Sequence, residues 1–143
     1  MIIFTIGFTR KSAEEFFTRL ARPGLKRVLD VRLNNRSQLA GFAKKSDLEY
    51  FLGTICNIEY VHLPELAPTQ ELLDSYKKKK GDWERYAEDF LELIRSRAVE
   101  SSVPQSLLDG GCLLCSEDTP ERCHRRLVAE YFQRIHGGEI VHL

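Results

Sequence analysis

The stretch GCLLCSEDTPERCHRR at residues 111–126 places an apolar run directly before a polar loop and the start of a helix. Residues 111–115 have the length and apolar character of a buried strand. The residues that follow supply a third thiol, carboxylates, an imidazole and several guanidinium groups. Reactive side chains gathered where a strand ends and a helix begins mark this segment as a candidate functional site.

Around this segment, strand patterns and helix patterns alternate along the chain. Strands are expected at residues 2–7, 27–32, 58–63, 111–115 and 139–143. Helices are expected after the capping boxes at Ser12 and Ser46, then at residues 69–80, 83–94 and 127–135, with a loop at residues 99–109. The alternation predicts a single three-layer α/β domain over residues 1–143, with a mostly parallel sheet of about five strands and helices on both faces.

Composition narrows the class of protein. The chain has 143 residues and a formal net charge of zero, which argues against a protein that coats nucleic acid or an anionic membrane. No apolar run approaches the roughly 18 residues of a membrane span, and residues 1–7 lack the features of a signal peptide. We therefore expect a cytoplasmic protein with no membrane partner, whose four cysteines are thiols or metal ligands and not structural disulfides.

In parallel sheets of this class, ligands bind beyond the carboxyl ends of the strands. Arg32 follows the second strand, and Ser37 belongs to the polar stretch after it. Glu65 follows the third strand, and Cys115 and Glu117 follow the fourth. A polar stretch with arginines could hold a phosphate or a ribose, or could equally be a solvated loop.

A metal site is one interpretation of the cysteines. Cys112, Cys115, Cys123 and His124 together form an acceptable set of zinc ligands. However, residues three apart on a strand point to opposite faces of a sheet, so Cys112 and Cys115 could not share one ion. On this ground we expect no metal and no cofactor.

An anion site is the second interpretation. Thr119 and Pro120 resemble an N-cap followed by proline at the first helical position. The free N–H groups of that helix would favour a phosphate or a cysteine thiolate, and Arg122 and Arg125 would add guanidinium donors. The loop has no glycine and contains Glu117 and Asp118, which would repel a phosphate, so it matches the cysteine loops of tyrosine phosphatases and rhodaneses poorly. A third interpretation, in which these cysteines are simply packed and the arginines solvated, stays open.

The sequence also resembles a known family. The resemblance lies in Thr5-Ile6-Gly7, Asp30-Val31-Arg32, residues 60–66 (YVHLPEL), residues 113–117 (LLCSE) and Cys123-His124-Arg125, in the order found in the domain of unknown function 488 family. It implies an α/β fold in a cytosolic protein without an assigned activity. It points to Arg32, Ser37, Glu65, Cys115, Glu117, Cys123, His124 and Arg125 as site residues. Family members often carry histidine and serine where this chain has Phe8 and Thr9.

The leading hypothesis is an enzyme, a hydrolase or transferase acting on a phosphorylated small molecule or a nucleic acid. The residues divide into anion-binding Arg32, Ser37, Glu65, Arg122 and Arg125, and catalytic Glu117, His124, Cys115 and Cys123. Glu117 or His124 would act as general acid or base. Cys115 and Cys123 would shape the pocket, or one would act as nucleophile.

Two alternatives come from other classes of protein. One is a thiol-redox or zinc-binding regulatory module, because Cys115 and Cys123 are close enough in sequence to meet. The other is a non-enzymatic domain that binds nucleic acid or protein, for which the lysine run at residues 77–80 is the candidate contact. The oligomeric state is left open.

Overall fold

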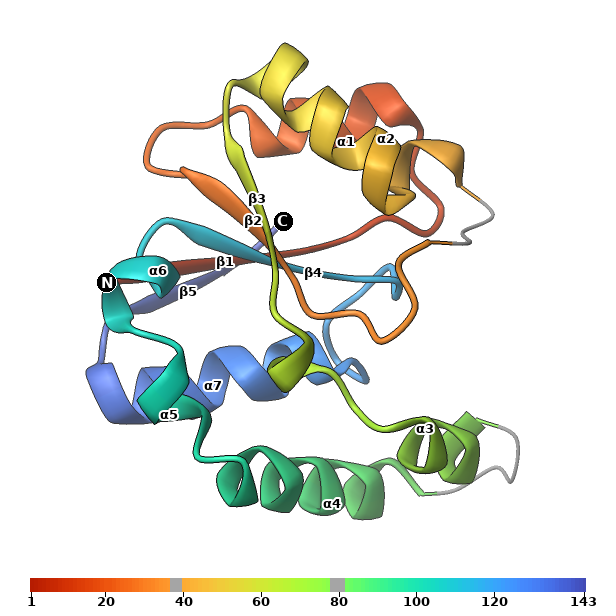
Figure 1. Cartoon of the computed structure of the whole chain (residues 1–143), viewed down its shortest axis with the longest axis vertical. Coiled ribbons are helices and arrows are strands. Elements are labelled where there is room, and N and C mark those ends of the chain that lie inside the picture. The colour runs from red at the N-terminus through yellow and green to blue at the C-terminus, as the bar shows by residue number, and fades with distance from the viewer. Residues whose placement is uncertain (37–39, 78–81) are drawn as a thin grey trace.

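The computed structural model describes residues 1–36, 40–77 and 82–143. Ser37 and the lysines at 78–80 lie outside these ranges, so the predictions made for them have no structural counterpart. The described residues form one parallel five-stranded sheet in the order β3-β2-β4-β1-β5 (Figure 1). The strands are β1 (Ile2–Gly7), β2 (Arg27–Asp30), β3 (Glu59–His62), β4 (Gly111–Cys115) and β5 (Glu139–His142).

Helices cover both faces of the sheet, which confirms the predicted fold class (Figure 1). One face carries α1 (Ala13–Leu20) and α2 (Lys45–Phe51). The other carries α3 (Gln70–Lys77), α4 (Trp83–Ser96), α5 (Val99–Ser102), α6 (Gln105–Leu108) and α7 (His124–His136). Short 3-10 turns at Gly41–Ala43 and Pro64–Leu66 and a π-helical turn at Leu52–Cys56 complete the connections.

The alternation of side chains along the strands produces two separate hydrophobic cores. Phe16 and Leu20 of α1 pack against one face of the sheet, together with Cys112. Phe90 of α4 packs on the other face, in the same cluster as Cys115. The prediction that Cys112 and Cys115 point to opposite faces is therefore confirmed.

The helix boundaries agree only in part with the N-caps predicted from the sequence. Ser12 is the N-cap of α1 and accepts a hydrogen bond from the Glu15 amide, as its capping box predicts. Ser46 is not an N-cap, because α2 already begins at Lys45. The loop expected at residues 99–109 contains α5 and α6 instead, since Val99 and Leu108 are fully buried and anchor these short helices to the core.

The order of the strands creates a crevice between β2 and β4. The connection after β2 leads to α2 on one face, and the connection after β4 leads to α7 on the other. Neighbouring strands whose connections leave in opposite directions open a crevice at their carboxyl ends, where α/β proteins bind ligands. None of the helices in the described ranges is both long enough and apolar enough to cross a membrane.

Candidate functional site in the β2–β4 crevice

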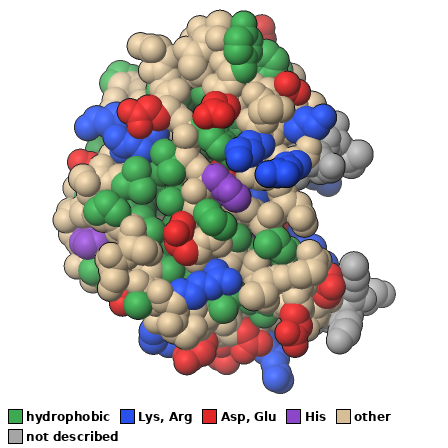
Figure 2. Space-filling model, viewed as in Figure 1, with side chains coloured by type: hydrophobic (Ala, Val, Ile, Leu, Met, Phe, Trp, Pro, Cys, Tyr) green, Lys and Arg blue, Asp and Glu red, His purple; other side chains and the backbone are tan. Residues whose placement is uncertain are grey.

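A pocket of about 340 Å³ occupies this crevice. It lies between the segments that follow β2 and β4, the first turn of α7, and one side of α3 and the start of α4. Figure 2 shows a hollow between the two helical layers at one edge of the molecule. The lining residues used below are Arg32, Tyr76, Lys77, Trp83, Tyr86, Cys115, Glu117, Arg122, Cys123 and His124. Its volume suits a small molecule.

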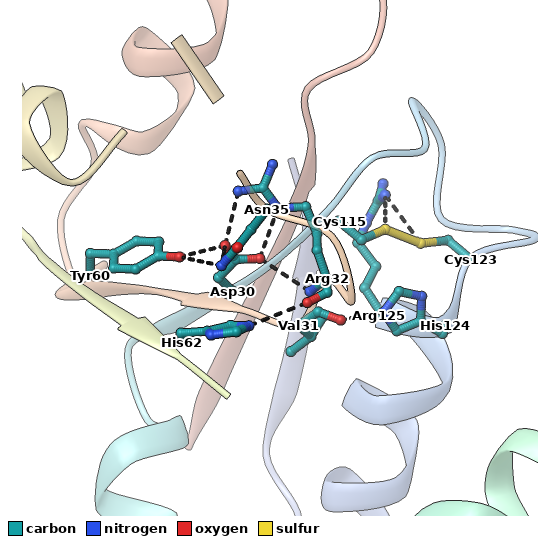
Figure 3. A network of polar contacts seen from close by, with 10 residues as sticks. All are labelled: Asp30, Val31, Arg32, Asn35, Tyr60, His62, Cys115, Cys123, His124 and Arg125. Atoms are coloured by element: carbon teal, nitrogen blue, oxygen red, sulfur yellow. Dashed lines mark hydrogen bonds and ion pairs between the residues drawn. A yellow bond between two sulfur atoms is a disulfide. The ribbon is translucent and has the colours of Figure 1, made fainter. Parts of the chain in front are cut away.

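Cys115 and Cys123 meet at the floor of this pocket. Cys115 is the last residue of β4, and Cys123 is the N-cap of α7. The structure joins them in a disulfide, and both side chains are almost fully buried (Figure 3). The prediction that they would meet is confirmed. The expectation of thiols or metal ligands without structural disulfides is wrong for this pair and holds for Cys56 and Cys112, which are free. The predicted N-cap at Thr119 is also wrong, because the loop continues to Cys123 before the helix begins.

Arg125 contacts the cysteine pair from inside the protein and not from the pocket. Its Nη1 is 3.3 Å from the Cys115 sulfur and 3.6 Å from the Cys123 sulfur, and it donates to the Glu117 carbonyl at 2.6 Å (Figure 3). Burial lowers the pKa of Arg125 to about 10, so the guanidinium stays charged at neutral pH. Arg125 is fully buried and does not line the pocket, so it supports the site from below and is not placed to bind an anion there.

Gly7 at the end of β1 makes room for this arginine. A Cβ atom at Gly7 would overlap the carbonyl of Glu117 and would stand 2.9 Å from Nη1 of Arg125. Only glycine allows the loop after β4 to pass this close to β1. The Thr5-Ile6-Gly7 block therefore shapes the floor of the site without entering the pocket.

His124 stands beside the two sulfurs with a defined tautomer. Its Nε2 lies 2.7 Å from the Val31 carbonyl oxygen, which can only accept a hydrogen bond. In a neutral ring Nε2 therefore carries the proton, and Nδ1 keeps its lone pair. Burial lowers the pKa of His124 to about 4, so the imidazole is neutral at pH 7. A neutral ring suits His124 to accept a proton or to ligate a metal, not to act as a general acid.

Arg32 is held in the pocket wall by a buried carboxylate (Figure 3). Its Nε and Nη2 each donate to Asp30 at 2.9 Å, and Tyr60 donates its hydroxyl to Asp30 at 2.6 Å. Burial raises the pKa of Asp30, but the hydrogen bonds and charge of Arg32 and the bond from Tyr60 outweigh it, so the pKa falls below its usual value. The Nη1 atom of Arg32 is buried and has no hydrogen-bond partner within the described ranges.

The rim of the pocket is charged. Lys77 and Glu117 form an ion pair of 3.0 Å, with each side chain about half exposed. Arg122 is exposed on the loop between β4 and α7. These rim side chains are accessible to a ligand, unlike Arg125.

An aromatic wall faces the strand ends and was not anticipated as part of the site. Tyr76, Trp83 and Tyr86 contact one another with ring centroids 4.8–5.7 Å apart. Sequence periodicity predicts that Trp83 and Tyr86 belong to the core, and Tyr86 is indeed buried. The same face of α4 contacts both the core and the pocket, so helical spacing alone could not separate the two environments.

The structure thus brings together most, but not all, of the predicted site residues. Arg32, Cys115, Glu117, Arg122, Cys123 and His124 line one pocket. Glu65 does not line it; its carbonyl accepts a hydrogen bond from Arg97, and its Oε1 is buried without a partner among the described residues. The anion-binding role predicted for Glu65 therefore has no support from its position.

Of three comparisons with known proteins, the one with family models gave a match. A family model described as "Domain of unknown function DUF488" matches residues 12–132. Comparisons with curated proteins and with solved structures found no match. The matched range includes β2, β3, β4, the pocket residues and most of α7. The chain therefore belongs to the DUF488 family of domains of unknown function.

Proposed function

We propose that this DUF488 protein is an enzyme that acts on a small phosphate-bearing molecule in the β2–β4 pocket. The proposal rests chiefly on Arg122, whose exposed guanidinium lies at the pocket rim close to the N-terminus of α7. A guanidinium can bind two oxygens of one phosphate group at once.

The charges around the pocket support an anionic ligand of modest charge. Asp30 neutralises Arg32, and the Lys77–Glu117 pair is too exposed to be strong. Arg122 makes no ion pair among those found in the described ranges. The N-terminus of α7 adds its dipole, because its N-cap Cys123 and its first residue His124 line the pocket. A phosphate group would thus meet one accessible guanidinium and a helix N-terminus.

The aromatic wall favours a ligand that carries a planar ring as well as phosphate. Stacking of a base on an aromatic side chain contributes about 1–3 kcal/mol in nucleic-acid-binding proteins. The wall formed by Tyr76, Trp83 and Tyr86 is part of the same pocket as Arg32 and Arg122. A nucleotide-like molecule satisfies both features, and the pocket volume of about 340 Å³ favours a single small unit over a duplex.

For the reaction itself, Glu117 is the proposed general acid or base. Its side chain lies at the rim, where the pair with Lys77 can open toward a ligand. His124 is neutral and can accept a proton, but its hydrogen bond to Val31 leaves no second proton to donate. A nucleophilic role for Cys115 or Cys123 would require reduction of the disulfide between them.

Binding can be followed through Trp83, the single tryptophan of the chain, which lines the pocket. We expect inorganic phosphate and nucleoside monophosphates to change its fluorescence, and Arg122→Ala to weaken this binding by about tenfold or more. Arg85→Ala is the matched control, since Arg85 is an exposed arginine on α4 outside the pocket. Equal affinities for wild type and Arg122→Ala would exclude the anion pocket. Binding without turnover of any phosphate ester would favour the non-enzymatic alternative.

A thiol-redox function is the second candidate, and the Cys115–Cys123 disulfide is the observation that favours it. The pair lines a pocket that a small disulfide or thiol could enter. In such a reaction the two thiols would lose two electrons and two protons to a substrate disulfide, which would leave as two thiols. Free-thiol counts of the reduced protein, before and after incubation with a small disulfide, test this function. Thiols that stay at four per chain would argue against it.

A further inference from the structure

We propose that the reduced protein binds a zinc ion through Cys115, Cys123 and His124, with the fourth coordination position open to the pocket. The proposal concerns the floor of the pocket described above, but it does not depend on the phosphate ligand. It revises the expectation, drawn from the sequence, that the chain binds no metal. That expectation relied on a ligand set that included Cys112.

The three donor atoms already converge. The two Sγ atoms and a ring nitrogen of His124 all lie within 4.8 Å of one another. Two sulfurs bound to one tetrahedral zinc ion at about 2.3 Å stand roughly 3.8 Å apart. Reduction of the disulfide therefore has to move the sulfurs only by a small distance to create a zinc site.

The backbone spacing also fits two thiolates that share an ion. The Cα atoms of Cys115 and Cys123 are 7.6 Å apart, wider than the roughly 4.4–6.8 Å usual for disulfides. At this spacing the two side chains can point toward a common ion without moving the end of β4 or the start of α7. Cys112 is excluded because it lies in the other core, on the opposite face of the sheet.

His124 is prepared as a ligand by its hydrogen bond. The Val31 carbonyl accepts from Nε2 at 2.7 Å, which fixes the ring and leaves the lone pair on Nδ1. Histidine ligands of metals commonly donate their other ring N–H to a carbonyl or carboxylate in this way. The ring of Phe90 lies 5.5 Å from the imidazole and limits its rotation further.

Arg125 provides the charge that two thiolates need. Its guanidinium is fully buried and donates to both sulfurs, and none of the ion pairs in the described ranges supplies it with a carboxylate. The carboxylate of nearby Asp118 pairs with Lys11 instead. A buried cation without a counter-charge is costly, and thiolates at Cys115 and Cys123 would neutralise it. The arginine then acts as an outer hydrogen-bond donor to the metal ligands.

The donor set selects zinc and leaves it reactive. Two thiolates and an imidazole are nitrogen and sulfur donors of the kind that bind zinc, and they do not suit magnesium or calcium. Within the described ranges no fourth side chain joins the group. Three protein ligands with an open position are typical of catalytic zinc, where water or a substrate oxygen completes the coordination. Such an ion could polarise a phosphate oxygen in the pocket.

The first experiment compares oxidised and reduced wild type. Dithiothreitol reduces the disulfide by transferring two electrons and two protons and is itself oxidised to a cyclic disulfide. After its removal without oxygen, the protein is titrated with Co²⁺, whose thiolate charge-transfer absorption reports sulfur ligands, and then with Zn²⁺. We expect the reduced protein to bind one metal ion per chain and to gain thermal stability with Zn²⁺, while the oxidised protein does neither. A reduced wild type that takes up no metal would overturn the proposal.

The second experiment assigns the ligands. Cys115→Ser and Cys123→Ser are expected to weaken zinc binding by more than about 100-fold, since even outer-shell changes cost 10–100-fold. Cys56→Ser is the matched control, because Cys56 is a free cysteine packed near α1. If Cys115→Ser and Cys123→Ser bind zinc as tightly as Cys56→Ser, the site lies elsewhere and the proposal fails. Arg122→Ala should keep its zinc while losing phosphate, so failure of the anion pocket would be seen separately.

Discussion

Arg125 donates to the sulfur of Cys115 from a fully buried position, at 3.3 Å. The guanidinium also holds the carbonyl of Glu117 and so ties the loop after β4 to the start of α7. The same cation therefore orients the cysteine pair and shapes the segment that bears Glu117. The electrostatic character of the site depends on a residue that no ligand in the pocket can reach.

The backbone of Gly7 lies so close to Glu117 and Arg125 that one added methyl group should destabilise the fold. Gly7→Ala would place Cβ against the Glu117 carbonyl and the Arg125 guanidinium, so either the loop or the arginine must move. We expect the free energy of unfolding to fall by about 1–3 kcal/mol or more, as for other overpacked positions. Urea denaturation followed by circular dichroism measures this change.

Gly53 provides the control for Gly7. A Cβ atom at Gly53 would meet no neighbour within 4 Å, so Gly53→Ala should change the free energy of unfolding by less than about 1 kcal/mol. Equal effects of the two substitutions would mean that the passage of the loop past β1 does not constrain the fold.

The sequence predicts the sheet and one side of the pocket well, for definite reasons. Strand ends can be located from apolar runs, and parallel strands bring Arg32 and Cys115 to one edge. The burial of Arg125 could not be predicted, because it depends on the packing of α7 against β1 at Gly7, which is far away in sequence. The predicted N-cap at Thr119 lies before the start of α7, since Thr119-Pro120 has the composition of a cap but not the position of one.

The Asp30–Arg32 pair predicts a loss of stability when its negative charge is removed. Asp30→Asn would leave the buried Arg32 without its counter-ion, and we expect a cost of about 3–5 kcal/mol. The pKa of Asp30 is lower in the folded protein than its ordinary value of 3.8. The pair therefore stabilises the fold above about pH 4, and this contribution disappears as the pH falls through the folded pKa.

Chemical denaturation between pH 3 and pH 7 tests both parts of this prediction. The difference between wild type and Asp30→Asn should be largest at neutral pH and shrink toward acid. Glu92→Gln is the control, because the exposed Glu92–Arg95 pair contributes about 0–1 kcal/mol. A difference that does not change with pH would show that Asp30 acts through packing and not through its charge.

Tyr60 supplies a hydrogen bond to the same carboxylate. Its hydroxyl donates to Asp30 at 2.6 Å, so Tyr60→Phe removes a bond to a charged group at little cost in shape. We expect a destabilisation of about 1.5–3 kcal/mol by thermal denaturation. Tyr50→Phe should have almost no effect, since Tyr50 is 66% exposed. Equal melting temperatures for wild type and Tyr60→Phe would mean that water replaces the hydroxyl at Asp30.

Reduction of the Cys115–Cys123 disulfide should lower the stability of the metal-free protein. The bond closes a loop with a sequence separation of 8, and constraint of a loop this short in the unfolded chain contributes about 2–3 kcal/mol. We therefore expect a lower melting temperature in dithiothreitol with a chelator present.

A Cys115→Ala, Cys123→Ala double variant should melt at the same temperature with and without the reductant, because it has no disulfide to lose. If wild type also melts at an unchanged temperature, the entropy gained by the unfolded chain must be offset in the folded protein. Hydrogen bonds from Arg125 to the freed sulfurs are the interaction placed to provide that offset.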